Sequence, residues 1–559
     1  MQTVSLLSAK AMRIAALFAL SFCLLVGSGT SRLHAQQGSL ADQIKLRLSQ
    51  FSKPGGNVIG GKAIAAAEFV SALYRERSFR AAWRDPTNFM ALVREVRESR
   101  NDGLIVDDFH ARALGFGRLD FWPPAMTAAE RDILKTSSLI NLLYQLYFGK
   151  VSPERIDPNW NLERQAPLPM ENAVRTISIA LETNDLASLI ALARGDDPGY
   201  LKLRETLKTY RGILERGGWP SVSAGAVLKP GMTDARVPVI RRRLAATADL
   251  GNESDASSNV YDPGLVEAVK AFQKRHGIDI DGIIGPAVTR ALNVSAEQRV
   301  DQIRVNLERA RWGARSLRRQ KDLVVVNIAG FYLLTVLDGQ FAWTTEVITG
   351  RPYHKTPVFT DRIRYIEFNP TWTIPPGILR NEILPKLRND PGYLTAKGYD
   401  LVAGNGAKVN PASVNWQTTG ARGFPYRVVQ PPGPKNALGL VKFMFPNKYN
   451  VYLHDTPSRQ LFGKTGRAFS HGCVRVKDPM KFAELLLGYR NRMTRQQIDQ
   501  TVASGRRTRV NLSKPIPVAI MYWTVDPLWQ DGIRFYEDVY RRDGKVLKAL
   551  NAKFRPAAR

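Results

Sequence analysis

One thiol lies in a short polar stretch near the carboxyl end of the chain. This stretch, residues 470–475, reads Ser-His-Gly-Cys-Val-Arg, and a second histidine, His454, comes nineteen residues before Cys473. An imidazole beside a thiol can take the thiol proton and later give it to the leaving amine, so that the sulfur can attack an amide carbonyl. The pattern therefore predicts acyl transfer, with Cys473 as the nucleophile and His454 as the base.

The second cysteine of the chain, Cys23, lies in a segment that is typical of an export signal. Basic residues precede a thirteen-residue apolar run, residues 14–26, which is too short to span a bilayer comfortably. We expect residues 1–35 to be a cleaved signal peptide, with an uncleaved inner-membrane anchor as the alternative. The mature protein would then keep one thiol, and a lone thiol in an oxidising compartment calls for a chemical explanation.

The neighbours of the thiol are residue types that support this chemistry. Gly472 lets the backbone turn tightly, so that amide hydrogens near Cys473 can face a developing oxyanion. Ser470 and His471 flank the turn, and either can orient the base or donate a hydrogen bond. Arg475 can neutralise a substrate carboxylate or brace the loop, and the sequence favours neither role.

Two aromatic residues are further candidates for the pocket. Tyr452 lies two positions before His454, on the same strand face, and Trp372 is either a wall of the pocket or a core residue. A zinc site on His454, His471 and Cys473 is a competing interpretation. However, a histidine and a cysteine two positions apart on a tight turn rarely converge on one metal, so we expect none. An inert, buried cysteine is the other alternative.

The carboxyl half of the chain has the pattern of a β framework. Short apolar strands separated by Gly- and Pro-rich turns recur over residues 322–505, and an Asp-Gly pair at 338–339 predicts a hairpin. A helical stretch interrupts this pattern, so residues 376–425 are expected to be an insertion near the site. Residues 506–559 are expected to be a C-terminal extension that packs on this mainly-β catalytic domain.

The amino-terminal half is helical in pattern. Apolar residues recur at three- and four-residue spacing over residues 36–225, which we interpret as a helical scaffold domain. Residues 226–295 predict a small three-helix domain, in which Asp-Pro opens one helix and an Asp-Gly-Ile-Ile-Gly-Pro loop lies at 281–286. Residues 296–321 read as a basic helical connector. The fold class is thus multidomain α+β.

The chain is strongly basic, which indicates anionic partners. Its net charge of +30 falls to +27 without the first 35 residues, which hold three basic side chains and no acid. Such a field attracts polyanions. Because we expect export, the predicted partners are wall polymer, substrate carboxylates or an anionic membrane or envelope surface, and nucleic acid is not expected. A basic surface with no single partner is the alternative.

Several of these spans resemble the L,D-transpeptidase (YkuD-type) family, and the domain order resembles its large periplasmic, YcbB-like members. Residues 226–295 resemble the peptidoglycan-binding domain found beside many wall enzymes. The spans that carry the first resemblance are 347–350 (Val-Ile-Thr-Gly), 356–357 (Thr-Pro), 369–372 (Asn-Pro-Thr-Trp), 432–439 (Pro-Gly-Pro-Lys-Asn-Ala-Leu-Gly), 445–447 (Phe-Pro-Asn), 452–456 (Tyr-Leu-His-Asp-Thr) and 470–475.

The resemblance implies a periplasmic enzyme of cell-wall organisation and cell shape that uses no cofactor and is a carbapenem target. Cys473 would attack the bond between the third stem residue, typically diaminopimelate, and D-alanine at the fourth. The side-chain amine of another diaminopimelate would then resolve the thioester, giving a 3→3 crosslink. Resolution by water, giving an L,D-carboxypeptidase, or by a lipoprotein amine stays open, as does a non-catalytic wall-binding scaffold. The acceptor, the exact donor stem and the oligomeric state are not fixed by the sequence.

Overall fold

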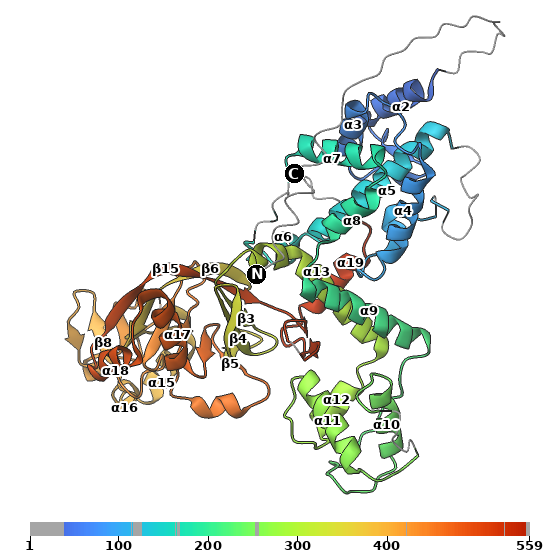
Figure 1. Ribbon diagram of the computed structural model, residues 1–559. Helices are drawn as coiled ribbons and strands as arrows, with labels where there is room; N and C mark the ends of the chain where they lie inside the picture. The colour runs from blue at the N-terminus through green and yellow to red at the C-terminus, as the bar shows by residue number, and fades with distance from the viewer. Residues whose placement is uncertain are drawn as a thin grey trace, which may run out of the picture.

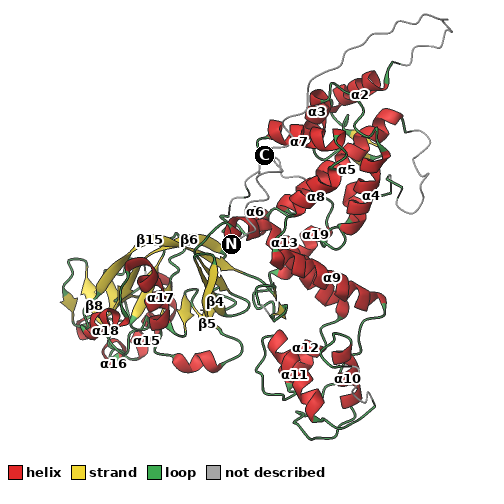
Figure 2. Ribbon diagram, in the orientation of Figure 1, coloured by secondary structure: helices red, strands yellow, loops and turns green. Residues whose placement is uncertain are grey.

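The computed structural model of the protein describes residues 38–112, 114–115, 126–162, 164, 168–251, 257–420, 422–529 and 531–554. The expected signal peptide, with Cys23, lies outside these residues. Figures 1 and 2 show three bodies joined along the long helix α13 (Ala296–Arg318): a helical body at the amino-terminal end, a small helical body and a β-rich body. Within the described residues, no helix is both long and apolar enough to cross a bilayer.

The first body is a helical bundle around its own apolar core, as the spacing of apolar residues predicted. Its central helix is α5, which starts at a capping box between Thr127 and Glu130 and buries Ile133 and Leu139 completely. The helices of this half of the chain are α2 (Leu40–Ser49), α3 (Ala67–Glu76), α4 (Pro86–Glu98), α5 (Ala128–Phe148), α6 (Pro153–Ile156), α7 (Met170–Glu182), α8 (Leu186–Arg194) and α9 (Pro198–Glu215).

The connector helix α13 is buried over much of its length and binds the bodies together. It packs against α9 and against the last helix, α19 (Asp543–Asn551). Arg311 of α13 forms a buried ion pair with Glu308 at 2.9 Å and donates to the hydroxyl of Tyr200 at 2.9 Å. A buried charge is tolerated only with such partners. The connector is therefore a packed, buried helix rather than a free linker.

The small body contains three helices, α10 (Val237–Ala245), α11 (Pro263–Arg275) and α12 (Pro286–Leu292), as expected. Asp262 caps α11 by accepting from the amide of Leu265, and proline occupies the first turn.

The β-rich body is built on a nine-stranded sheet in the order β13-β5-β14-β12-β11-β6-β15-β3-β4, and β4 also pairs with β5. This extra pairing closes the sheet on itself around one core. The strands are β3 (Leu323–Asn327), β4 (Tyr332–Leu337), β5 (Gln340–Gly350), β6 (Phe359–Phe368), β11 (Val441–Met444), β12 (Leu453–His454), β13 (Ala468–Ser470), β14 (Val474–Val476) and β15 (Thr508–Met521). Two helices follow β14, namely α17 (Pro479–Asn491) and α18 (Arg495–Ala503), and α17 buries Phe482 in this core.

The structure corrects part of the extension that was expected from residue 506. Strand β15 is central in the sheet, between β6 and β3, and it buries Ile516, Val518 and Ile520. Because these side chains are part of the core of the sheet, residues 508–521 belong to the sheet itself, and the domain boundary expected between residues 505 and 506 is wrong. The chain then continues through β16 (Val525–Asp526) and β17 (Arg534–Phe535) to α19.

The insertion has a core of its own, which includes Leu394, Leu401 and Trp416. It carries the expected helical segment as α14 (Pro376–Ile378), η4 (Leu379–Ile383), α15 (Leu384–Asn389) and α16 (Tyr393–Ala396). It also carries a four-stranded antiparallel sheet that the sequence did not indicate, with the strands β7 (Trp372–Thr373), β10 (Tyr426–Gln430), β8 (Asp400–Ala403) and β9 (Lys408–Val409). The inserted part is thus α+β instead of helical alone.

Candidate active site

Cys473 lies at the turn between β13 and β14, and hydrogen bonds hold this turn in one shape. The Ser470 hydroxyl donates to the Cys473 carbonyl oxygen at 2.5 Å and accepts from the Gly472 amide at 3.0 Å. Gly472 has a φ of +114°, a region that favours glycine. The thiol is half-buried and forms no disulfide. Ser470 therefore stabilises the turn, and its hydroxyl both donates and accepts a hydrogen bond within the turn.

A second set of contacts supports the same turn from behind. The Thr356 hydroxyl donates to the Gly472 carbonyl oxygen at 2.8 Å and accepts from the Gly350 amide at 2.9 Å. A Cβ on Gly350 would lie 2.0 Å from the His354 carbonyl oxygen, so only glycine fits there. The Tyr540 hydroxyl donates to the Gly350 carbonyl oxygen at 2.5 Å and accepts from the Thr356 amide at 3.2 Å. The end of the chain thus braces the turn.

The sheet brings His454 beside the thiol. Strand β12 pairs in parallel with β14, with His454 opposite Arg475 and Cys473 two positions earlier on the same face. The His454 ring is buried, and its Nδ1 lies 2.5 Å from the Asp455 carbonyl oxygen. Since a carbonyl can only accept, we assign the ring proton to Nδ1, which leaves Nε2 as an acceptor. The predicted base is thereby held in the tautomer that can take a proton.

The electrostatics of the pair favour two neutral groups at rest. Burial first, and then the nearby Arg475 and Lys442 cations, together lower the pKa of His454 to about 3, against the opposing effect of its hydrogen bond to Asp455. Burial also raises the pKa of the Cys473 thiol, although hydrogen bonds from Tyr452 and the same two cations oppose the rise. The site therefore starts as a thiol and an uncharged imidazole.

Tyr452 is at the centre of the site. Its ring meets the His454 ring edge-on, with 5.6 Å between centroids, and its side chain interacts with the Cys473 thiol and with Trp372. Burial and the neighbouring sulfur raise the pKa of the Tyr452 hydroxyl. Lys442 Nζ lies 4.2 Å from the Tyr452 ring centroid. Lys442 was not predicted as a site residue, because one lysine in a four-residue strand carries no signal of a site.

Trp372 and His471 both link the site to the insertion. Trp372 is half-buried on β7 and packs beside Tyr399 against the insertion core. His471 Nε2 lies 2.5 Å from Glu382 Oε1, and Glu382 belongs to η4. The His471 side chain thus contacts the insertion. This geometry favours a role in holding the insertion over a role in orienting His454.

Arg475 faces the thiol without an ionic partner. Its side chain is half-buried, and its Nε is buried with no hydrogen-bond partner among the described residues. Burial lowers the pKa of this guanidinium, while the nearby sulfur of Cys473 raises it. A buried donor without an acceptor costs about 1–3 kcal/mol, which a ligand carboxylate would recover. This geometry favours the carboxylate role over the bracing role.

Metal ligation finds no support in the side-chain arrangement. Within the part of the chain that the structure describes, no group of three or more His, Cys, Asp or Glu residues is placed to hold a metal ion.

Comparisons with protein families match three parts of the chain. Residues 321–512 match the YkuD L,D-transpeptidase catalytic domain, and residues 233–292 match a "Putative peptidoglycan binding domain". Residues 68–207 match a family described as a scaffold domain. The chain therefore contains an L,D-transpeptidase catalytic domain of the YkuD type together with a peptidoglycan-binding domain, which confirms the resemblance at the level of the family.

Two curated relatives share parts of the sequence. A "Putative L,D-transpeptidase" of Haemophilus influenzae (strain ATCC 51907 / DSM 11121 / KW20 / Rd) is 35% identical over 201 residues, which are 36% of this chain and 40% of the relative. N-acetylmuramoyl-L-alanine amidase CwlL of Bacillus licheniformis is 40% identical over 72 residues, which are 13% of this chain and 20% of the relative. The matched segments thus span less than half of either relative.

A solved structure, the L,D-transpeptidase from Xylanimonas cellulosilytica DSM 15894, is 15% identical and covers 54% of this chain and 99% of its own, with a TM-score of 0.15. A score this low carries no argument about the fold.

Proposed function

We propose that the chain is a periplasmic L,D-transpeptidase that forms 3→3 crosslinks in peptidoglycan through a thioester on Cys473. The observation that carries this proposal is the pairing of a half-buried thiol on a supported turn with a buried, neutral imidazole on the adjacent strand. The YkuD match over residues 321–512 and the relative named "Putative L,D-transpeptidase" support it.

In the first half-reaction, His454 Nε2 takes the thiol proton as the sulfur bonds to the carbonyl carbon between the third stem residue and D-alanine. The carbon–nitrogen bond then breaks, the imidazolium gives its proton to the departing D-alanine amine, and a thioester remains. The Gly472 amide donates to Ser470 and the Val474 amide to the Tyr452 carbonyl oxygen, so the Cys473 amide is our candidate for the oxyanion donor.

In the second half-reaction, an acceptor amine attacks the thioester carbon and gives a proton to His454. The carbon–sulfur bond breaks, and the sulfur recovers its proton from the imidazolium. One amide is exchanged for another, so the thioester carries the energy and no nucleotide is needed. Arg475, whose Nε has no partner, is the candidate to hold a carboxylate of the stem.

The insertion favours transfer over hydrolysis. A transferase must hold an amine at the thioester and keep water away, whereas a hydrolase needs neither. The Glu382–His471 contact, at 2.5 Å, ties the insertion to the catalytic turn, and the insertion has an apolar core of its own. A cover attached in this way can shield the thioester while an acceptor enters.

The wall is the proposed partner, and the periplasm is the proposed compartment. The match over residues 233–292 and the amidase relative support contact with peptidoglycan, and the high positive charge favours anionic wall polymer. Binding to an anionic membrane or envelope surface stays a prediction from that charge.

Product analysis tests the proposal. The chain without residues 1–35 would be incubated with disaccharide-tetrapeptide, and the products would be separated by liquid chromatography and identified by mass spectrometry. We expect dimers linked from diaminopimelate to diaminopimelate, with one D-alanine released per bond. Tripeptide monomers as the sole product would identify an L,D-carboxypeptidase and refute the crosslinking activity. If neither product forms, both the crosslinking and the carboxypeptidase activity are refuted.

A further inference from the structure

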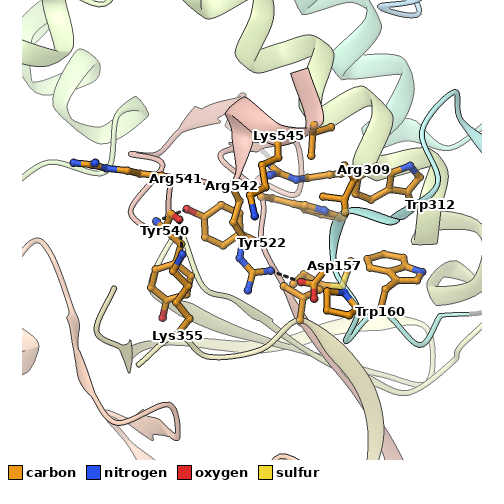
Figure 3. Close-up of a pocket in the computed structure, with 16 residues that line it drawn as sticks. Asp157, Trp160, Arg309, Trp312, Lys355, Tyr522, Tyr540, Arg541, Arg542 and Lys545 are labelled. Carbon is orange, nitrogen blue, oxygen red and sulfur yellow. Dashed lines mark hydrogen bonds and ion pairs between the residues drawn. The ribbon is translucent and has the colours of Figure 1, made fainter. Parts of the chain in front are cut away.

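A cavity of about 240 Å³ lies between the end of the amino-terminal helical half, α13 and the β-rich body, away from Cys473. Its walls come from the segment after α6, from α13, from the sheet and from the segment that leads into α19 (Figure 3). Ligand sites occur preferentially at such junctions between domains, and this volume lies just below their usual range of about 300–1,000 Å³. A cavity of this size suits one ring-sized group.

The walls of the cavity are aromatic. Trp160 and Trp312 meet edge-on, with 5.6 Å between their ring centroids, and Tyr522 and Tyr540 are stacked at the same separation. In Figure 3 the two indoles lie on one side and the two phenols on the other. Flat faces of this kind pack well against a ring.

The cations around the cavity outnumber the acids that pair with them. Arg542 pairs with Asp157 at 2.6 Å, and Arg309 pairs with Asp543 at 2.7 Å. Lys355 and Lys545 also line the cavity, and neither forms an ion pair with any described residue. Lys355 Nζ donates only to the Tyr540 carbonyl oxygen, at 3.0 Å. The remaining positive charge favours an anion.

A buried donor gives a second, independent indication of a ligand. Trp523 lines the cavity and is 8% exposed, and its Nε1 is buried without a hydrogen-bond partner among the residues that the structure describes. The indoles of Trp160 and Trp312 instead donate to Leu162 and Glu308. An unsatisfied buried donor is costly, so a ligand acceptor at this wall would recover the lost hydrogen bond.

We propose that this cavity binds a small anion, a carboxylate or a phosphate carried on a ring, with the ring against the aromatic walls and the anionic group near Lys355 and Lys545. The site is separate from the thiol but is connected to it. Tyr540 forms one wall, and its hydroxyl reaches Gly350 and Thr356, which hold the Gly472 turn.

Calorimetric titration of the Cys473→Ala chain tests the proposal without any turnover, so its outcome does not depend on the proposed activity. The choice of sugar probes alone rests on that activity. N-acetylmuramic acid carries a carboxylate on the lactyl ether attached to its ring, N-acetylglucosamine 1-phosphate carries a phosphate, and N-acetylglucosamine is the neutral control. We expect at least one anionic probe to bind more tightly than the neutral sugar and to weaken as salt is raised. The tighter of the two identifies the anionic group.

Variants assign the binding to this cavity. The double variant Lys355→Met/Lys545→Met should weaken the anionic probe by about tenfold, because two uncompensated cations are lost. Lys548→Met is the matched control, since Lys548 is exposed on the same helix and does not line the cavity; it should bind as the parent does. Equal binding of all three sugars, or an unchanged affinity in the double variant, would overturn the proposal.

Discussion

The turn at Cys473 and the loop at residues 281–286 both carry short sequence motifs, yet their polar groups are used in opposite ways. Gln273, which is 1% exposed, accepts from the Gly282 amide at 2.9 Å and donates to Asp281 at 2.7 Å and to the Ile283 carbonyl oxygen at 3.1 Å. Every hydrogen-bonding group of that side chain is thus occupied within the small domain.

The catalytic turn instead leaves groups available. Arg475 Nε has no hydrogen-bond partner among the described residues, and His454 Nε2 is left as an acceptor. Buried polar groups are normally satisfied, and exceptions gather at functional sites. We infer that the motif of the small domain maintains its fold, whereas the motif of the sheet is the one that we propose does the chemistry. Any glycan contact of the small domain must then use other, exposed residues.

The largest expected effect comes from the imidazole of His454 on β12, the strand next to the Cys473 turn. His454→Ala should slow acylation by a carbapenem by roughly 100-fold or more, the scale of a lost general base. His471→Ser should lose less, because His471 contacts Glu382 of the insertion. Stopped-flow measurement on both variants makes the comparison. A larger defect at His471 would reverse the two roles.

A change in the small domain should have the opposite character. Gln273→Leu leaves the Gly282 amide and the Ile283 carbonyl without a partner, and each buried orphan costs about 1–3 kcal/mol. Hydrogen exchange of residues 226–295 should therefore accelerate, while acylation at Cys473 stays unchanged. Lys270→Ala, at an exposed position on the same helix, is the control and should leave exchange unaltered. Slowed acylation in Gln273→Leu would contradict the claim that the motif of the small domain acts only on the stability of that domain.

Tyr540→Phe should have a moderate effect on the turn. The variant loses the hydroxyl that contacts Gly350 and Thr356. Since a lost hydrogen bond costs about 1 kcal/mol or more, we expect acylation to slow by about tenfold. The affinity of the initial carbapenem complex should not change, because the ring does not contact the thiol. Tyr449→Phe, which loses a hydroxyl contact to Asn159 elsewhere on the sheet, is the matched control. Equal rates in both variants would remove Tyr540 from the account of the turn.

The smallest expected effect concerns pH. The pKa of His454 is lowered to about 3, below the ordinary value of about 6.5, so this ring stays neutral between pH 5 and 8. The acylation rate should therefore show no inflection near pH 6.5. Stability should behave differently: the unfolded chain binds this proton below about pH 6.5 and the folded chain does not, so this contribution to stability declines as pH falls from about 6.5 toward 3. Nuclear magnetic resonance can follow the titration of the His454 ring in the Cys473→Ala chain. A ring that titrates near pH 6.5 would contradict this prediction.

Much of the fold followed from local patterns. Two of the three helices of the small domain, α11 and α12, follow from Asp-Pro and Gly-Pro signals, and the helices of the first body follow from apolar spacing. The sheet of the insertion was missed because its strands have two to five residues, too few for alternation to show.

The site was predictable where its residues share one motif. His454 and the residues 470–475 meet because β12 and β14 are neighbours, and their types and spacing already indicated thiol chemistry. Glu382 and Tyr540 were not predictable, because they reach the turn from 89 and from more than 60 residues away along the chain. Only the tertiary structure brings such residues together, and neither has a neighbour in sequence that marks it.

The central claim is that Cys473 is the nucleophile, and mass spectrometry of the intact protein tests it most directly. The chain without residues 1–35, in which Cys473 is the one cysteine, would be incubated with a carbapenem beside its Cys473→Ala variant. We predict a single adduct on the parent chain and none on the variant, with the same melting temperature for both. An adduct of equal yield on the alanine variant would contradict the assignment.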